Sequence, residues 1–246
     1  MYITDSHIHL QDFKSQKTEE ILELAYKNNV KSFVNISSHP NDWQSVLDIS
    51  NKYENIIPAI GIHPWYSDNI SETQLSKLET LLQQYPQLWV GECGLDKIKN
   101  KDISSQLNIF ISQIKLANKY NRPLIIHSVH ANEETEKLFS SLPKKTIFHS
   151  FNGSIEWGKK IQKAGFYIGI NFSILKKKNN EDIIKSLDIN KILLETDGPY
   201  QGLKKNTENK PINIHYLLQY ITKTLNITEN KLTKILYNNW IIFSKK

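Results

Sequence analysis

Short apolar runs alternate with longer amphipathic segments along the whole chain. Some runs, such as Leu124–Ile126 and Ile192–Leu194, are apolar at every position, which is typical of parallel strands covered by helices on both faces. The predicted strands are Tyr2–His9, Lys31–Ser37, Ile56–Gly61, Leu88–Glu92, Pro123–His127, Thr146–His149, Tyr167–Asn171 and Lys191–Thr196. The predicted helices are Lys17–Asn28, Asp42–Lys52, Ser71–Gln84, Ile103–Tyr120, Asn132–Ser141, Ser154–Ala164, Glu181–Leu187, Ile212–Leu225 and Thr228–Ile242.

This alternation predicts an α/β protein with the (β/α)8 TIM-barrel fold. Eight strands, each followed by a helix, fit the length of 246 residues. An open doubly wound sheet is the competing architecture, but it usually has a glycine-rich phosphate loop after its first strand, and Leu10–Phe13 occupies that place here. Because no linker, repeat or low-complexity segment interrupts the pattern, we expect one domain over residues 1–246.

The composition fits a globular protein, with 39% hydrophobic and 23% charged residues. We expect no transmembrane helix, because the sequence has no apolar run of ~18 residues. The first residues carry neither a basic region nor an apolar signal core, so no secretion signal is expected. Cys93 is the single cysteine, which excludes an internal disulfide and fits a reducing environment, so we predict a cytoplasmic location.

The net charge of +6 gives a mild indication of anionic partners. Lysine is abundant throughout the chain, however, so the charge by itself names no partner. Arg122 is the only arginine, and it precedes its predicted strand. Because this position is at the N-terminal end of the strand, we do not expect Arg122 to clamp a phosphate.

The first predicted strand carries an unusual polar face. Side chains alternate along a strand, so Asp5, His7 and His9 share one face, whereas Ile8 and Leu10 share the other. Two imidazoles at this spacing can point at one metal ion. Taken alone, the pattern is equally compatible with hydrogen-bonded histidines that hold no metal.

Polar residues also follow other predicted strands, at the end where barrels of this type carry their active sites. The candidate ligands for two divalent metals are His7, His9, Glu92, His127, His149 and Asp197. Imidazole and carboxylate ligands suit Zn, Mn, Mg, Fe or Co, and the sequence does not choose among them. A pair of metals needs a bridging carboxylate, and Glu92 is central enough in the chain to provide it.

The chain resembles the TatD-type metal-dependent hydrolases of the amidohydrolase superfamily. The stretches that carry the resemblance are Asp5–His9, Gly61–Pro64, Gly91–Asp96, Arg122–Ser128, His149–Ser154 and Leu194–Tyr200, with Asn238–Phe243 as the closing helix. They occur in the family's order over nearly the whole length. The resemblance implies metal-dependent hydrolysis, with DNA phosphodiesters as the best-known substrate class.

The resemblance also implies a role for each matching residue. His7 and His9 would hold one metal with Glu92 and Asp197. His127 and His149 would hold the second metal, with Glu92 between the two. His63 matches a histidine near the substrate phosphate. The superfamily's other branch bridges its metals with a modified lysine at the position of Glu92, so the carboxylate favours the TatD-type arrangement.

The expected mechanism uses a metal-activated water as the nucleophile. Asp197 would orient this water and accept its proton, and Glu92 would act through the metals. Asp5, Asp96 and Glu195 are expected to support the ligands from behind. For Glu195, a buried hydrogen bond without any role in the site is an equally good interpretation.

One residue departs from the family pattern. Family members often carry an arginine two residues after the histidine of strand five, and Val129 stands there in this chain. A phosphate contact is therefore lost, or it is supplied by His130 or by a lysine. The departure bears on substrate and rate and leaves the metal site intact.

Lysines and aromatic residues recur in the segments that follow the strands. The lysines are Lys97, Lys99, Lys101, Lys176, Lys177, Lys178, Lys204, Lys205 and Lys210. The aromatic residues are Trp65, Tyr66, Phe151, Phe172 and Tyr200. They could attract a polyanion and stack on unpaired bases. Alternatively, lysine is simply common, and Trp65 and Tyr200 anchor their loops.

Three functions remain open at this level. The first is an exonuclease-like phosphodiesterase that acts on DNA, in particular single strands or 3′ ends, with no membrane association and no obligate protein partner. The second is a hydrolase of small amides, lactones or esters on the same metal site. The third is a metal-binding protein that lacks useful catalysis or serves as a partner-binding module.

Overall fold

The computed structural model describes residues 1–202 and 207–245. Its strands are β1 (Ile3–Ile8), β2 (Val30–Ile36), β3 (Ile56–Ile60), β4 (Trp89–Asp96), β5 (Leu124–Val129), β6 (Thr146–Phe148), β7 (Tyr167–Ile170) and β8 (Ile192–Leu194). Its α-helices are α1 (Thr18–Lys27), α2 (Trp43–Lys52), α3 (Glu72–Gln84), α4 (Ser104–Lys119), α5 (Asn132–Glu136), α6 (Ile155–Lys163), α7 (Asn180–Ser186), α8 (Ile214–Leu225) and α9 (Glu229–Ser244).

The strands form an eight-stranded sheet in the order of the chain, from β1 to β8. The pairs β3–β4, β4–β5, β5–β6 and β7–β8 are parallel. The first strand also meets the segment after the last, because the amide of Asp197 donates to the carbonyl of His7 at 2.9 Å and the amide of His9 donates to Gly198 at 2.7 Å. The predicted (β/α)8 TIM-barrel fold is confirmed.

The chain divides into two compact units, one made of Met1–Val34 with Ser150–Lys246 and the other of Asn35–His149. The single domain expected over residues 1–246 stays a prediction. Within residues 1–202 and 207–245, none of the helices combines the length and the apolar character needed to cross a lipid bilayer.

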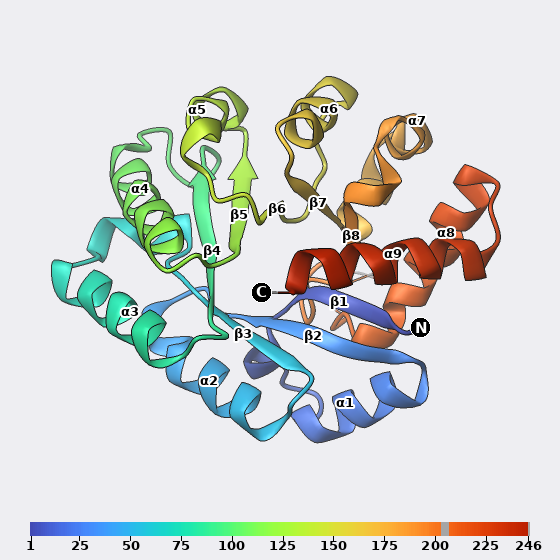
Figure 1. The fold of residues 1–246 in the computed structure, drawn as a ribbon, viewed down its shortest axis with the longest axis horizontal. Coiled ribbons are helices and arrows are strands. Elements are labelled where there is room, and N and C mark those ends of the chain that lie inside the picture. The colour runs from blue at the N-terminus through green and yellow to red at the C-terminus, as the bar shows by residue number, and fades with distance from the viewer. Residues whose placement is uncertain (203–206, 246) are drawn as a thin grey trace. The chain divides into compact units, whose positions relative to one another are not determined.

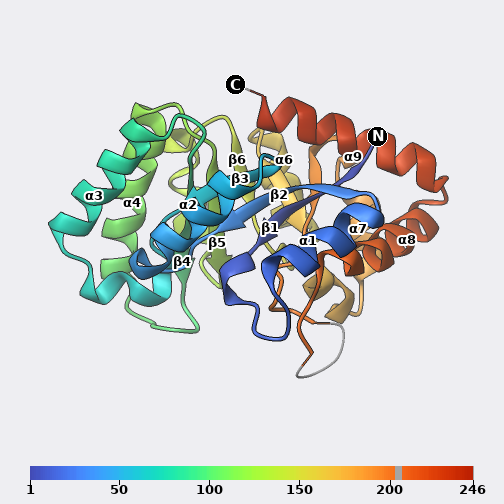
Figure 2. The same cartoon turned by 90° about the horizontal axis from the view of Figure 1, so that it is seen from below.

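In the first unit, the C-terminal helices cover β1 and β8. Figure 2 shows α8 and α9 side by side, and the ring of Tyr2 meets the ring of Tyr237 edge to face at 5.0 Å. The side chain of Asn239 donates to the carbonyl groups of Ile189 and Ile192, which ties α9 to the beginning of β8. The hydroxyl of Thr228 caps α9 by accepting a hydrogen bond from the backbone amide of Lys231.

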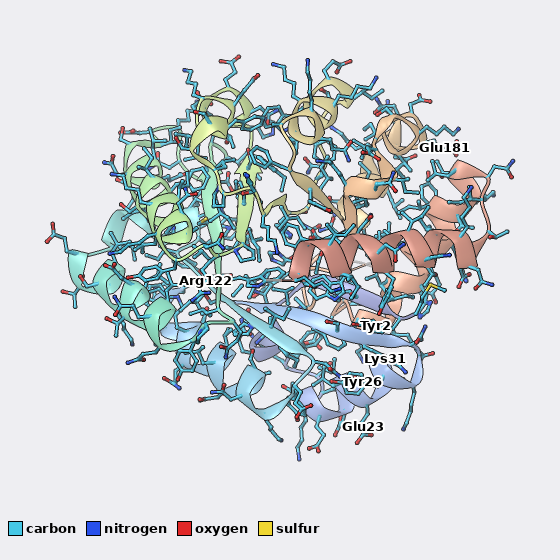
Figure 3. The ribbon with its side chains drawn as sticks, in the orientation of Figure 1. Tyr2, Glu23, Tyr26, Lys31, Arg122 and Glu181 are labelled. Carbon is cyan, nitrogen blue, oxygen red and sulfur yellow. The ribbon has the colours of Figure 1, made fainter. Side chains whose placement is uncertain are left out.

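In the second unit, α3 and α4 lie on the same side of β3 and β4 (Figure 1). The buried indole of Trp43 donates to the carbonyl of Gly61 at 2.9 Å and so fixes the end of β3. Arg122, labelled in Figure 3, precedes β5 and donates to the carbonyl of Leu82 at 3.1 Å. The only arginine is therefore at the strand's N-terminal end, as predicted.

Two elements differ from the predicted ones by more than two residues at one end. The helix predicted over Asn132–Ser141 ends at Glu136, and a separate short turn of 3-10 helix follows at Phe139–Ser141. Strand β4 continues through Asp96, four residues beyond the predicted end at Glu92. It does so because its pairing with β5 shifts register between Val90 and Cys93 and then resumes. Asp96 is therefore the last residue of a strand, and it pairs with Val129.

Candidate functional site

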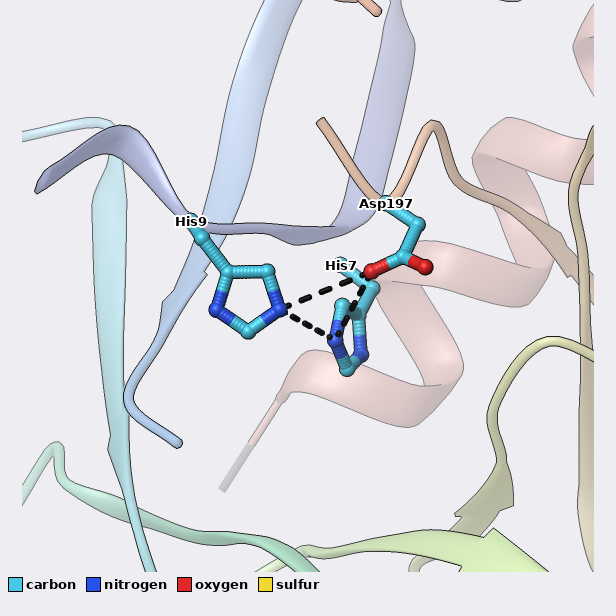
Figure 4. A group of neighbouring side chains, drawn as sticks. All are labelled: His7, His9 and Asp197. Atoms are coloured by element: carbon cyan, nitrogen blue, oxygen red, sulfur yellow. Dashed lines mark hydrogen bonds and ion pairs between the residues drawn. The ribbon is translucent and has the colours of Figure 1, made fainter. Parts of the chain in front are cut away.

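The first unit brings together the side chains of His7, His9 and Asp197, named here the first ligand group. The Nε2 atoms of the two histidines lie 3.2 Å apart, and each lies 3.5 to 3.6 Å from Oδ1 of Asp197. Figure 4 shows the three atoms facing one another. All three residues are buried. His7 and His9 thus face the same side, as predicted, although β1 ends at Ile8 and His9 follows it. Asp197 reaches them from the segment after β8.

This geometry fits a divalent cation. In the plane of these three atoms, one point is equidistant from all of them. It lies about 2.0 Å from each, which is the usual length of a Zn–N or Zn–O bond. A hydrogen bond between the two imidazoles would account for the contact between their nitrogens but not for the approach of both nitrogens to Asp197. Two nitrogens and one carboxylate oxygen also form a donor set that Zn, Mn, Fe and Co all accept. The first ligand group therefore fits a metal.

Asp5 supports this group from behind. It is fully buried, and its carboxylate accepts from the backbone amide and the hydroxyl of Thr196 and from the amide of His7. Burial outweighs these hydrogen bonds and raises the pKa of Asp5 to about 7. Asp197 follows with a left-handed backbone, at φ 59°, a conformation that aspartate tolerates and that is common at functional sites. Asp5 thus fixes the backbone of His7 and of Thr196, the residue before Asp197.

Glu195 is also buried in the first unit. Its Oε1 accepts from the backbone amide of Ser150 at 2.6 Å, and Ser150 has a left-handed backbone at φ 50°. A methyl group on Gly169 would collide with the other carboxylate oxygen, so the glycine leaves room for Glu195. The observed contact is with backbone, and the orientation of histidines predicted for Glu195 stays a prediction.

The second unit brings together His63, Glu92 and His127, named here the second ligand group. Oε1 of Glu92 lies 2.8 Å from Nδ1 of His127 and 3.5 Å from Nε2 of His63, and these two nitrogens are 3.3 Å apart. Nε2 of His149 lies 3.7 Å from the same carboxylate oxygen. The point equidistant from the first three atoms is about 1.9 Å from each, so this group also fits a metal.

Asp96 holds His127 in place. Its Oδ2 lies 3.2 Å from Nε2 of His127, so one ring nitrogen faces Asp96 while the other faces Glu92. A carboxylate behind a metal-binding histidine fixes the orientation of the ring. Burial alone would lower the pKa of His127, but the hydrogen bonds to Asp96 and Glu92 raise it to about 9. Burial would raise the pKa of Asp96, yet the bonds from His127, Trp65 and Lys99 hold it well below its ordinary value.

The sequence did not indicate two features of the second unit. Nε2 of His63 lies beside Glu92, which the sequence did not suggest, and the contact to a substrate phosphate expected for His63 stays a prediction. Trp65 donates from its indole nitrogen to Oδ2 of Asp96 at 2.7 Å, the same oxygen that faces His127. A spacing pattern cannot reveal this bond, because Asp96 was expected after the strand instead of at its end.

An aromatic residue also contacts the first ligand group. The ring of Tyr200 meets the ring of His9 edge to face at 5.4 Å, and its hydroxyl donates to Asp12 at 2.9 Å. Tyr200 is 51% exposed. Tyr200 is thus anchored, as one interpretation of the sequence expected, and still presents part of its ring to solvent.

The basic and aromatic residues predicted to follow the strands are only partly described. Lys97 forms an ion pair with Glu134 at 2.7 Å, which neutralises one of these cations. Lys204 and Lys205 lie outside the described residues. His130, one of the residues considered as a substitute for the missing arginine, is exposed and has a left-handed backbone at φ 53°.

Comparison with known proteins identifies the family. The family description "TatD related DNase" matches residues 4–243. Deoxyribonuclease TATDN3 of Homo sapiens is 27% identical over 254 residues, which cover 96% of this chain and 92% of the human protein. A second relative is the uncharacterized metal-dependent hydrolase MJ1582 of Methanocaldococcus jannaschii, which is 29% identical. The match covers 98% of this chain and 96% of the length of MJ1582.

A solved structure agrees with these matches. The crystal structure of YjjV, a TatD homologue from Escherichia coli K12, superposes with a TM-score of 0.91 at 25% identity and covers 98% of this chain and 97% of its own. The family match, the shared fold and the two ligand groups agree on divalent metal use and on hydrolysis of ester bonds. The chain belongs to the TatD-related DNase family of metal-dependent hydrolases.

Proposed function

We propose that this chain hydrolyses phosphodiester bonds of DNA with two divalent metal ions, one in each ligand group. The proposal rests on the geometry of the two ligand groups. In each group, three donor atoms lie about 2 Å from a common point, which is the usual length of a bond to a divalent metal. The DNase name of the human relative supports the substrate class. The pI of 9.1 is compatible with a polyanionic substrate.

The ligands divide between the groups in a testable way. His7, His9 and Asp197 would hold one ion, and Glu92 and His127 would hold the other, with His149 as a further ligand. The bridging role predicted for Glu92 stays a prediction. The position of His63 fits a ligand as well as the predicted contact to substrate phosphate. Counting bound metal in His63→Asn separates these roles, because only the loss of a ligand lowers the metal content.

The residues of the first ligand group suggest how the reaction proceeds. A divalent cation held there would supply a Lewis acid for the phosphoryl oxygens and favour ionisation of water near neutral pH. Oδ1 of Asp197 faces the two imidazoles, and Oδ2 points away from them (Figure 4). Asp197 would therefore keep one oxygen to accept the proton of the attacking water. His7 and His9, both buried, would exclude bulk water from that step.

We propose single-stranded DNA or 3′ ends as the substrate, attacked in an exonuclease-like manner. Zn, Mn, Mg, Fe and Co remain the candidate metals, because the mixed nitrogen and oxygen donors suit Zn, Mn, Fe and Co and the carboxylate oxygens suit Mg. Cys93 is fully buried, and burial raises the pKa of its thiol, so we assign it no chemistry. The cytoplasmic location stays a prediction.

One experiment tests the proposed function directly. The metal-free protein is reconstituted with each of the five metals and assayed on single-stranded DNA, duplex DNA, a simple phosphodiester and a panel of carboxylic esters and lactones. We expect metal-dependent hydrolysis of DNA with release of nucleotides from one end. Hydrolysis of esters or lactones without cleavage of DNA would contradict the proposal and favour the small-molecule alternative.

A further inference from the structure

Trp65 lies between solvent and the second ligand group. The side chain is 51% exposed, although tryptophan is usually well buried. Its ring meets the ring of His63 at 5.1 Å, with the planes at 90°, so the edge of one ring faces the other. Its indole nitrogen donates to Asp96 at 2.7 Å. The polar edge of the indole is thus fixed on the protein, and a large part of the residue remains open to solvent.

Asp96 holds a lysine in the same place. Its Oδ1 accepts from the backbone amides of Ile98 and Lys99 at 2.9 and 3.1 Å, while its Oδ2 accepts from Trp65. The ammonium of Lys99 lies 5.6 Å from the centre of the Trp65 ring. Lys99 is exposed. One carboxylate therefore holds the indole of Trp65, the backbone of Lys99 and the ring of His127.

This combination suits an unpaired nucleotide. Every nucleobase can stack on an indole, and a neighbouring lysine can contact the phosphate of the same nucleotide. Loop anchoring by itself explains the hydrogen bond to Asp96, but it does not require an exposed ring with a cation beside it. A base in a duplex is already stacked on its neighbours, so this arrangement favours a single strand.

We propose that Trp65 and Lys99 form a nucleotide subsite beside the second ligand group, which binds one unpaired base by stacking and the adjoining phosphate by charge. The inference rests on the proposed function, because it names the part of the nucleic acid that the site recognises. Trp65 would be a substrate-binding residue that also positions Asp96. These two roles are separable, since phenylalanine keeps a ring for stacking but cannot donate a hydrogen bond to Asp96.

The test measures binding and hydrolysis in parallel. Metal-reconstituted Trp65→Leu, Trp65→Phe and Lys99→Gln are titrated with a labelled phosphorothioate oligonucleotide, which resists hydrolysis, and with an abasic oligonucleotide of the same length and linkage. We expect Trp65→Leu to weaken binding of the normal strand roughly tenfold and to leave the abasic strand within about twofold. Trp65→Phe should stay within about threefold for both. Lys99→Gln should weaken both strands similarly and reduce the salt dependence.

Matched controls come from exposed residues outside the site. Tyr216 on α8 is 59% exposed, and Lys77 on α3 is exposed, so Tyr216→Leu and Lys77→Gln should leave both affinities unchanged. Thermal unfolding of each variant checks that the fold persists. Because Trp65 is half exposed, we expect Trp65→Leu to fold.

Several outcomes would overturn the inference. Equal losses in Trp65→Phe and Trp65→Leu would show that Trp65 acts only through its bond to Asp96. An equal loss for the abasic strand would exclude base stacking, and unchanged binding by Lys99→Gln would exclude the phosphate contact. If the parent hydrolyses DNA and Trp65→Leu binds the oligonucleotide as tightly as the parent does, the subsite is refuted and the proposed function stands. Base-dependent loss of binding in Trp65→Leu, together with no hydrolysis of DNA by the parent, refutes the proposed function alone.

Discussion

The two ligand groups are alike in their donor atoms but differ in what supports them. Behind the first group stands Asp5, which is fully buried and bonded to Thr196 and the backbone of His7. Behind the second stands Asp96, which is bonded to His127 and to the half-exposed Trp65. The hydrogen bonds of Asp5 thus go to buried residues, whereas one hydrogen bond of Asp96 goes to a residue at the surface.

The difference also appears in the charges of the supporting carboxylates. Burial raises the pKa of Asp5 to about 7, whereas the donors around Asp96 hold its pKa far below the ordinary value. Asp96 is therefore an anion at neutral pH and keeps His127 oriented by charge as well as by geometry. Within the part of the chain that the structure describes, the carboxylate behind the first group is bonded only to buried residues, whereas the carboxylate behind the second group is also bonded to a residue that is exposed to solvent.

The largest expected effect comes from the carboxylate of the first ligand group. Asp197→Asn should lower kcat for DNA about 10²- to 10⁴-fold, because the amide cannot accept the proton of water. Steady-state kinetics of the metal-reconstituted variant measures this, with metal content determined in the same sample. Activity close to that of the parent would remove Asp197 from the mechanism.

The independence of the two groups gives the next prediction. His9→Asn and His127→Asn should each lower the metal content from about two ions per chain to about one, because each removes a ligand from one group only. Elemental analysis after dialysis measures the content. Loss of both ions in either variant would contradict one ion per group and favour a shared site.

Removing the charge of Asp96 should lower metal affinity more than removing the carboxylate of Asp5. Asp96→Asn should weaken metal binding about 10- to 100-fold, because an amide orients the ring of His127 less firmly than a carboxylate does. Asp5→Asn should change metal affinity less, since the side-chain oxygen can still accept from the amide of Thr196. Competition with a coloured chelator gives both affinities. Equal losses would abolish the contrast between the groups.

The smallest effect on catalysis should come from Gly169. A methyl group there collides with Glu195, so Gly169→Ala should lower the free energy of unfolding by about 1–3 kcal/mol. If Glu195 only holds the backbone of Ser150, kcat of the folded variant should stay near that of the parent. Urea unfolding and kinetics on one preparation test this, and a large fall in kcat would give Glu195 a role in the site.

Much of the architecture could be predicted because its signals are local. The apolar runs identified all eight strands, and the amphipathic segment Thr228–Ile242 identified α9 to within two residues at each end. The alternation of side chains predicted for the first strand placed His7 and His9 together, since His7 belongs to β1 and His9 comes directly after its last residue. The end of β4 was wrong, because a register shift beside Gly91 cannot be read from an apolar pattern.

The sequence by itself determined the fold class, the family resemblance and the types of ligand available. Only the tertiary structure decided that His63 lies beside Glu92 and His127, because Glu92 belongs to β4, His127 belongs to β5 and His63 follows β3, and the relative positions of these strands depend on pairing register. It also decided that Trp65 and Lys99 meet on Asp96. Spacing along a chain fixes which side chains share a strand face, but distances between strands arise only when the sheet assembles.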